Sequence, residues 1–146
     1  PAGAVSASQV GLIDLLPSLA ALAEVPMPEG AAPDGADVSP VILGGDAEQG
    51  KVLVHHSMGG AFAIRSGQWK AIFASGSGLG FSQPYGRLLD GEDGEGQLYD
   101  LESDPDEHDN LWSRHPDIVA NLYRELTTIV DSPDNGLHFD IPLTHR

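Results

Sequence analysis

The spacing of apolar positions changes along the chain, and it predicts helices near both ends with strands between them. Leu15, Leu19 and Leu22 follow the i, i+4, i+7 spacing of one helix face, with further apolar residues beside them. We expect a helix over residues 14–23, with Asp14 as its N-cap, after a short extended segment at residues 10–13. This helix is apolar nearly all round, which is typical of a helix sandwiched between layers. The chain by itself should therefore expose an apolar patch.

The middle of the chain has the pattern of a β-meander. Three short runs are rich in β-branched, aromatic and small residues, and they predict strands at residues 51–57, 61–65 and 68–74. Residues 66–67, Ser-Gly, suit a two-residue hairpin turn. With that turn, Ile64 lies opposite Trp69, and Phe62 lies opposite Ala71.

The second half of the chain completes an α+β pattern. The alternating segment Gln97–Leu101 predicts a fourth strand, and an acidic turn follows at residues 103–106. Pro116 then opens an amphipathic helix that should end near Asp131. Its apolar residues stand at i+4 steps: Ile118, Leu122, Leu126 and Val130. The intervening segments are rich in Pro and Gly and predict loops, with one helical turn at residues 40–43.

Composition and charge narrow the classes of partner. The chain has 146 residues, 40% of them hydrophobic, which suits one globular domain. Its formal net charge of −15 argues against nucleic acid and anionic membrane surfaces, because both need a basic surface. Cysteine is absent, so the sequence carries no disulfide or thiolate metal site. No stretch has the length of a membrane span, and the first nine residues lack the features of a signal peptide. These first residues are expected to lie inside a longer chain.

Four segments in order resemble the C-terminal subdomain of the type I (formylglycine-dependent) sulfatases, the arylsulfatase family. They are Leu-Ile-Asp-Leu-Leu-Pro-Ser-Leu at residues 12–19, Asp-Gly-Ala-Asp-Val-Ser-Pro at 34–40, Gly-Ala-Phe-Ala-Ile-Arg-Ser-Gly-Gln-Trp-Lys-Ala at 60–71 and Leu-Tyr-Asp-Leu-Glu-Ser-Asp-Pro-Asp-Glu-His-Asp-Asn-Leu at 98–111. In the same order, these segments resemble four motifs of the family: Val-Asp-Leu-x-Pro-Thr-Leu, Asp-Gly-x-Ser-Leu-x-Pro, Phe-Ala-Ile-Arg-x-Gly-x-Trp-Lys and Leu-Tyr-Asp-Leu-x-x-Asp-Pro-x-Glu-x-x-Asn-Leu. The second segment, residues 34–40, has one extra residue. Together they cover residues 10–130.

The resemblance implies the following fold and partners. The chain is expected to be one subdomain of an alkaline-phosphatase-like α/β hydrolase, with a docking segment and helix at 10–25, a β-meander at 51–101 and a C-terminal helix at 116–131. It implies a small four-stranded antiparallel sheet with a long C-terminal helix and an N-terminal apolar helix. The expected partner is the catalytic N-terminal sulfatase domain, and the expected substrate is a sulfated small molecule or glycan. Family members are typically periplasmic or secreted.

The family's chemistry is expected to reside outside this chain. Family members use a formylglycine, made from a Cys or Ser in Cys/Ser-x-Pro-x-Arg, and a divalent cation, usually calcium. The nearest match is residues 82–87, Ser-Gln-Pro-Tyr-Gly-Arg, in which Arg87 stands one position late. The acidic stretch at residues 90–109 lacks the ligand spacing of a calcium loop, and Gly-Ser-Gly-Leu-Gly at residues 76–80 lacks the Lys of a phosphate loop. The chain alone is therefore expected to be inactive, with no catalytic or metal-binding residue.

His55 and His56 are the candidate substrate-binding residues. Adjacent residues of a strand point to opposite faces, so one of them at most can face a given pocket. The resemblance places the loops and strand ends of this subdomain at the border of the substrate pocket, where a histidine can bind a sugar hydroxyl or a sulfate oxygen. A hydrogen-bonded structural histidine is the alternative for each. For Arg65 and Lys70 we expect pairing with nearby carboxylates rather than substrate binding.

Three functions remain open from the sequence. The first is the C-terminal portion of a sulfatase that hydrolyses carbohydrate or aryl sulfate esters, bracing the catalytic domain and bordering its pocket. The second is a free-standing acidic α+β domain that binds a glycan or a protein. The third is a related enzyme acting on phosphate or phosphonate esters. A Cys/Ser-x-Pro-x-Arg motif upstream of Pro1 would separate the first from the second.

Overall fold

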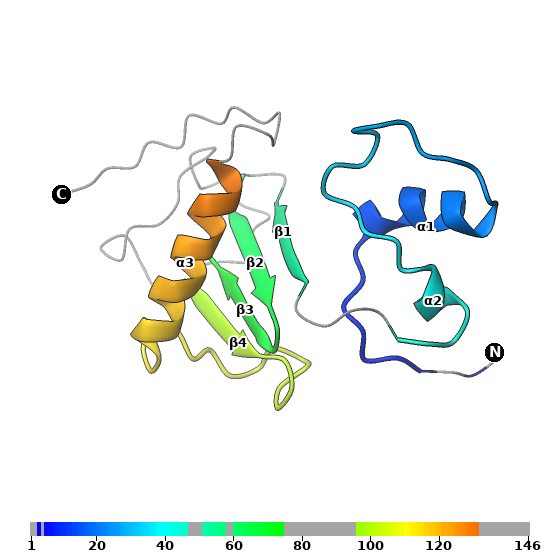
Figure 1. Ribbon diagram of the computed structural model, residues 1–146. Helices are drawn as coiled ribbons and strands as arrows, with labels where there is room; N and C mark the ends of the chain where they lie inside the picture. Colours follow the sequence, from blue (N-terminus) through cyan, green and yellow to red (C-terminus); the bar gives the residue numbers. More distant parts are fainter. Residues whose placement is uncertain (1–2, 4, 47–50, 58–59, 75–95, 132–146) are drawn as a thin grey trace. The chain divides into compact units, whose positions relative to one another are not determined.

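A computed structural model describes residues 3, 5–46, 51–57, 60–74 and 96–131 (Figure 1). The chain divides into two compact units, Pro1–Lys51 and Val52–Arg146. Its elements are a short 3-10 helix η1 (Leu12–Asp14), helix α1 (Leu15–Leu22), the short helix α2 (Ser39–Ile42), strands β1 (Val52–His56), β2 (Phe62–Ser66), β3 (Trp69–Ile72) and β4 (Gln97–Asp100), and helix α3 (Pro116–Val130). The four-stranded antiparallel sheet and the helices confirm the expected α+β class. The segments at residues 76–80, 82–87 and 90–95 lie outside the described residues.

The first unit buries polar side chains and exposes leucines. Asp14 and Ser18 have no exposed surface, whereas Leu16 is 54% exposed and Leu19 is 57% exposed. Within its own unit, α1 thus leaves leucines exposed, as the sequence predicts. Helix α1 ends at Leu22 with Ala23 as its C-cap, and the next residue, Glu24, takes a left-handed backbone with φ of 54°. Two amides close this end, from Glu24 to the Ala21 oxygen and from Val25 to the Ala20 oxygen, as in a Schellman motif.

Two local predictions for this unit are wrong. Residues 12–14 form a 3-10 turn, not an extended segment, because the Asp14 amide bonds back to the Gly11 oxygen. Asp14 stands at the N-cap position of α1, but its carboxylate does not cap the helix. It accepts instead from the Gly11 amide at 2.8 Å, from the Ala36 amide at 2.9 Å and from the Lys51 ammonium.

Asp14 and Ser18 hold the loop after α1 against the helix. Ser18 donates to the Asp14 carbonyl at 2.7 Å and accepts from the Val38 amide at 2.8 Å. Burial raises the pKa of Asp14, but the hydrogen bonds from Lys51, Ala36 and Gly11 outweigh it and hold that pKa below its ordinary value. The first unit is therefore organised around a buried, ionised carboxylate.

In the second unit the sheet has the order β1-β2-β3-β4 with antiparallel neighbours throughout. The predicted register of the β2–β3 hairpin is wrong. Ile64 pairs with Ala71 instead of Trp69, and Trp69 pairs with Ser66. The two-residue turn is Gly67-Gln68, because Gly67 has the positive φ of 59° that the first central position requires. Moving the turn by one residue changes each pairing by two, so every side chain keeps its predicted face.

Helix α3 covers one face of this sheet (Figure 1). Its Leu122 and Leu126 form one core with buried residues of the strands, Phe62, Ile64, Ala71 and Leu98, and with Phe73, which follows β3. Phe73 also contacts the rings of Trp112 and Tyr123 edge-on, with centroid separations of 5.6 and 5.5 Å. The amphipathic period of α3 thus places its apolar stripe on the sheet, as the sequence predicts.

Candidate functional site

The two candidate histidines stand at the end of β1 on opposite faces of the sheet. His56 pairs with Phe62, a core residue, and so points to the face that α3 covers. Its ring lies 6.0 Å from the Phe62 ring, edge-on, and its Nδ1 lies 2.9 Å from the Ser57 oxygen. These contacts are those of a structural histidine. The substrate contact of His56 stays a prediction.

His55 lies on the other face, which we call the polar face. It pairs with Ala63, a small residue. On the same face, Arg65, Lys70 and Tyr99 form one row across β2, β3 and β4. Arg65 pairs with Lys70, and Lys70 pairs with Tyr99. The polar face consists of Leu53, His55, Ala63, Arg65, Lys70, Ile72, Gln97 and Tyr99. It therefore brings together two of the chain's seven basic residues and a histidine.

Glu107 supplies a counter-charge to this row. Like charges directly opposite each other in a sheet are destabilising, and Arg65 and Lys70 are such a pair. The Lys70 ammonium lies 2.5 Å from the Glu107 carboxylate, which comes from the loop after β4. Glu107 itself has a left-handed φ of 58°, an uncommon conformation for a residue with a side chain. The structure thus confirms the expected pairing of Lys70 with a carboxylate.

The surroundings of His55 favour its neutral form. Desolvation by the surrounding sheet lowers the pKa of His55 although the imidazole keeps much of its surface in solvent, and the Lys70 ammonium lowers it further. The Glu107 carboxylate acts in the opposite direction but is outweighed. A neutral imidazole has one nitrogen that donates and one that accepts, which suits a hydroxyl group.

Tyr99 and Gln97 complete the polar face on β4. The Tyr99 hydroxyl donates to Gln97 Oε1 at 2.8 Å, and Gln97 Nε2 donates to the Ala74 oxygen at 3.0 Å. Burial raises the pKa of Tyr99, and the charges of Glu107 and Asp104 raise it further, so its hydroxyl stays protonated. These two side chains are held in fixed positions beside the Lys70–Glu107 pair.

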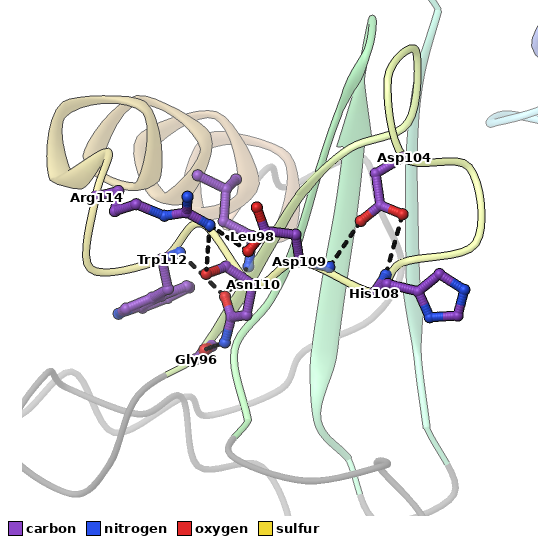
Figure 2. Close-up of polar contacts among 8 residues, drawn as sticks. All are labelled: Gly96, Leu98, Asp104, His108, Asp109, Asn110, Trp112 and Arg114. Atoms are coloured by element: carbon purple, nitrogen blue, oxygen red, sulfur yellow. Dashed lines mark hydrogen bonds and ion pairs between the residues drawn. The ribbon is translucent and has the colours of Figure 1, made fainter.

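The loop that carries Glu107 is fixed by its own polar residues. Figure 2 shows Asp104 accepting from the amides of His108 and Asp109, at 3.1 and 2.8 Å. Asn110 Oδ1 accepts from the amides of Leu98 and Trp112, each at 3.0 Å, and Asn110 Nδ2 donates to the Gly96 oxygen at 3.0 Å. Asp104 and Asn110 thus cap the turns before the last helix through their side chains.

The fold brings together residues that the sequence had not connected. His55, Lys70 and Glu107 come from β1, β3 and the loop after β4, and only the sheet register shows that the first two share a face. Glu107 was not singled out, because it stands among ten acidic residues between positions 90 and 109. Its distinguishing signal is its place in the turn that follows Asp104, which aims it at the sheet.

Within the described part of the chain, no group of three or more His, Cys, Asp or Glu side chains is arranged to hold a metal ion. Among the same residues no helix has the length and apolar character needed to cross a membrane. The groups that the polar face presents are hydrogen-bonding side chains and the charged Lys70–Glu107 pair.

Comparison with known proteins identifies the family. An N-acetylgalactosamine-6-O-sulfatase of Bacteroides thetaiotaomicron is 37% identical over 120 residues, which are 82% of this chain and 22% of that protein. Human arylsulfatase A is 35% identical over 121 residues, which are 68% of this chain and 21% of that protein. The chain thus spans about a fifth of the length of the curated relatives that it matches. No family model matches the chain.

Solved structures agree with these relatives. A structure from work on the metabolism of multiple glycosaminoglycans by Bacteroides thetaiotaomicron has a TM-score of 0.58 and 34% identity, covering 80% of this chain and 24% of that one. Ps i-CgsB, solved in complex with k-i-k-neocarrahexaose, has a TM-score of 0.57 and 25% identity, covering 88% of this chain and 25% of that one. The predicted resemblance is confirmed: the chain belongs to the sulfatase family and corresponds to its C-terminal region.

Proposed function

We propose that the protein to which this chain belongs hydrolyses sulfate esters of a carbohydrate, and that this chain borders the substrate pocket through His55. The observation that carries the proposal is the position of His55 at an exposed strand end, on the same face as the Lys70–Glu107 pair. Membership of the sulfatase family supports the reaction class. The geometry of the polar face supports the role of His55.

His55 is suited to bind a hydroxyl or a sulfate oxygen as a neutral group. Its lowered pKa means that a charge-assisted bond from an imidazolium is not what this site provides near neutral pH. A neutral imidazole can donate one hydrogen bond and accept another, which matches the vicinal hydroxyls of a sugar ring better than a fully ionised sulfate. This role sharpens the sequence-based expectation for His55.

Lys70 has a supporting role in this proposal. Its ammonium is held by Glu107, so the positive charge is largely compensated before any substrate arrives. The pair fixes the loop and sets the charge that His55 experiences. We therefore assign substrate contact to His55 and positioning to Lys70.

The family's formylglycine and divalent cation would be supplied by the part of the protein that this chain does not span. There the cation would supply charge stabilisation for the sulfate, and the formylglycine would supply the nucleophile. The described residues of this chain do not form a cluster suited to the cation. In this proposal the contribution of the chain is to bind and orient the organic part of the substrate.

A carbohydrate substrate is favoured over an aryl sulfate by the relatives. One relative carries the name N-acetylgalactosamine-6-O-sulfatase, and one structural neighbour was solved with a neocarrahexaose. The arylsulfatase names of other relatives keep aryl sulfates as the alternative. Both substrate classes belong in the test.

The test uses a chimera in which this chain replaces the matching region of the Bacteroides thetaiotaomicron sulfatase. His55→Ala should raise KM for 6-O-sulfated N-acetylgalactosamine about three- to tenfold with kcat nearly unchanged, because one hydrogen bond is worth about 0.5–1.5 kcal/mol. His108→Ala is the matched control, since His108 is exposed and forms its structural bond through its amide. Thermal unfolding of both variants checks that they fold.

Unchanged KM in a folded His55→Ala chimera would contradict the role of His55. Equal loss with His108→Ala would also contradict it, because the effect would not be local. An active chimera that hydrolyses only a small aryl sulfate would exclude the carbohydrate assignment. His55→Gln should recover part of the affinity, because its amide also donates and accepts.

A further inference from the structure

The carboxylate of Glu107 occupies the place beside Lys70 that an anionic group of a ligand would otherwise take. The Lys70 ammonium and the Glu107 carboxylate lie 2.5 Å apart, and both side chains keep exposed surface, 20% for Lys70 and 31% for Glu107. An anion that approaches the polar face from solvent therefore meets a cation that is already paired. It also meets an exposed carboxylate of its own sign, which repels it.

The backbone of the loop fixes the position of Glu107. Its amide donates to the Asp104 carbonyl at 3.2 Å, and the Asp104 carboxylate accepts from the amides of the next two residues, His108 and Asp109 (Figure 2). These bonds on both sides hold Glu107 in its left-handed conformation. The carboxylate is thus preorganised beside Lys70 before a ligand arrives.

The Lys70–Glu107 pair lies at some distance from His55 along the polar face. Lys70 is two strands away from His55 and displaced by two residues along the sheet. With about 4.8 Å between strands and about 3.4 Å per residue, the two Cα atoms are about 12 Å apart. A glycan that contacts His55 through one sugar unit therefore brings an adjoining unit to the pair.

Arg65 increases the effect that Glu107 has on this part of the face. It stands directly opposite Lys70 and has the same charge. Without the charge of Glu107, the Lys70 ammonium would lose its counter-charge and would still have a second cation as its neighbour. Such a surface attracts an external anion.

We infer that Glu107 is a specificity-determining residue, which excludes glycans whose sugar unit next to the one at His55 carries a carboxylate or a further sulfate. The preferred substrate has an uncharged sugar unit in that place. The inference rests on the proposed function, because it takes the sulfated sugar to be bound at His55. It adds the charge of the adjoining sugar and the side chain that selects it.

The test compares two disaccharides in the Bacteroides thetaiotaomicron chimera. Each contains 6-O-sulfated N-acetylgalactosamine, linked in one to a uronic acid and in the other to a neutral hexose. The wild-type chimera should have the higher KM for the uronic acid compound. Glu107→Gln should lower the ratio of the two KM values about fivefold, the upper range for a partly exposed ion pair. Effects that act through His55 cancel in this ratio, because both compounds carry the same sulfated sugar.

Three comparisons show whether the change comes from the Lys70–Glu107 pair. Glu102→Gln is the matched control and should leave the ratio unchanged, since it removes the same charge from an exposed position of the same loop. Adding Lys70→Met to Glu107→Gln should raise the ratio again, because the freed ammonium attracts the uronate. High salt should reduce the effect of Glu107→Gln, because exposed charges are screened. Thermal unfolding checks that each variant folds.

An unchanged ratio in a folded Glu107→Gln chimera would overturn the inference, and so would an equal fall with Glu102→Gln. Calorimetric binding of the two desulfated disaccharides repeats the comparison without catalysis. An inactive chimera whose binding shows the expected change of ratio would contradict the proposed function alone. An active chimera in which His55→Ala raises KM, but Glu107→Gln leaves the ratio unchanged, would contradict this inference alone.

Discussion

The two units of the chain differ in what they bury and in what they leave in water. The first unit buries Asp14 and Ser18 completely and leaves the leucines of α1 in solvent. The second unit buries Ile64 and Leu126 completely and holds Lys70 in an ion pair with Glu107. Both units follow the same rule that buried polar groups must be paired and apolar groups must be covered. Among the described residues, the second unit covers its apolar core by itself, whereas the first leaves the leucines of α1 uncovered.

This difference indicates which unit can stand alone. The second unit has a contiguous core in which α3 closes one face of the sheet, so its stability comes from its own packing. The first unit is held by a few buried hydrogen bonds and one buried ion pair. We therefore expect substitutions to destabilise the two units by different mechanisms and to different extents.

The largest expected effect is that of Asp14→Ala on the first unit. The substitution leaves the Lys51 ammonium and two amides without their acceptor, and breaking a buried pair typically costs about 3–5 kcal/mol. Native-state hydrogen exchange should show loss of protection in α1 and at Val38, with unchanged protection in α3. Asp37→Ala is the control, because Asp37 accepts from the amide and the side chain of Ser39 at an exposed turn. Equal effects of the two variants would show that Asp14 does not organise the unit.

Substitution of one leucine in each unit tests how far each unit depends on apolar packing. Leu126 is fully buried and Leu16 is 54% exposed. Leu126→Ala should lower the free energy of unfolding by about 2–5 kcal/mol, because it leaves a cavity in the only core of the second unit that the described residues show. Leu16→Ala should change it by less than about 0.5 kcal/mol, as for an ordinary surface site. Urea unfolding of the isolated chain measures both. A large loss for Leu16→Ala would show that α1 is covered within the chain.

Periodicity predicted the elements of both units but the environment of only one. The i+4 steps of α3 place its apolar stripe on the sheet, because the strands that cover it belong to the same chain. The same kind of spacing in α1 predicts a sandwiched helix, yet the covering layer is not among the described residues. A hydrophobic pattern reports what a surface is suited to contact, and it does not report whether the contact lies in the same chain.

The candidate site was predictable in part for a similar reason. The alternation of a strand sends His55 and His56 to opposite faces, and that much follows from the sequence. The partners of each follow only from the β1–β2 register. The placement of Lys70 on the face of His55 also depends on the β2–β3 register, in which a one-residue change of the turn altered the pairing by two residues. Glu107 reaches Lys70 through a left-handed backbone position that nothing in its residue type indicates. Long-range pairings of this kind depend on turn geometry rather than on propensity.

A smaller effect is expected at the loop that positions Glu107. Asn110→Ala removes bonds to Leu98, Trp112 and Gly96, and should cost about 1–3 kcal/mol in the second unit. Asn110→Asp should cost less, because it keeps the acceptor for the two amides and loses only the donor to Gly96. The control is Asn121→Ala, whose exposed bond to Arg124 should be worth little. Chemical denaturation ranks the three, and a neutral Asn110→Ala would show that the loop is held by other contacts.

The smallest effect, and the one most specific to the polar face, concerns the titration of His55. Lys70→Met should raise the pKa of His55, because the ammonium lowers it, whereas Glu107→Gln should lower that pKa further, because the carboxylate acts in the opposite direction. NMR titration of the imidazole measures both shifts.

Since the folded pKa of His55 lies below the ordinary value of about 6.5, the native state binds fewer protons than the unfolded chain just below that pH. The contribution of His55 to stability is therefore complete above about pH 6.5 and is lost as the pH falls from there through the folded pKa. His55→Gln should remove this part of the pH dependence and leave the rest. Shifts of the same sign in Lys70→Met and Glu107→Gln would show that the two charges do not act on His55 from one shared face, and the polar face would then lose its claim to be a single site.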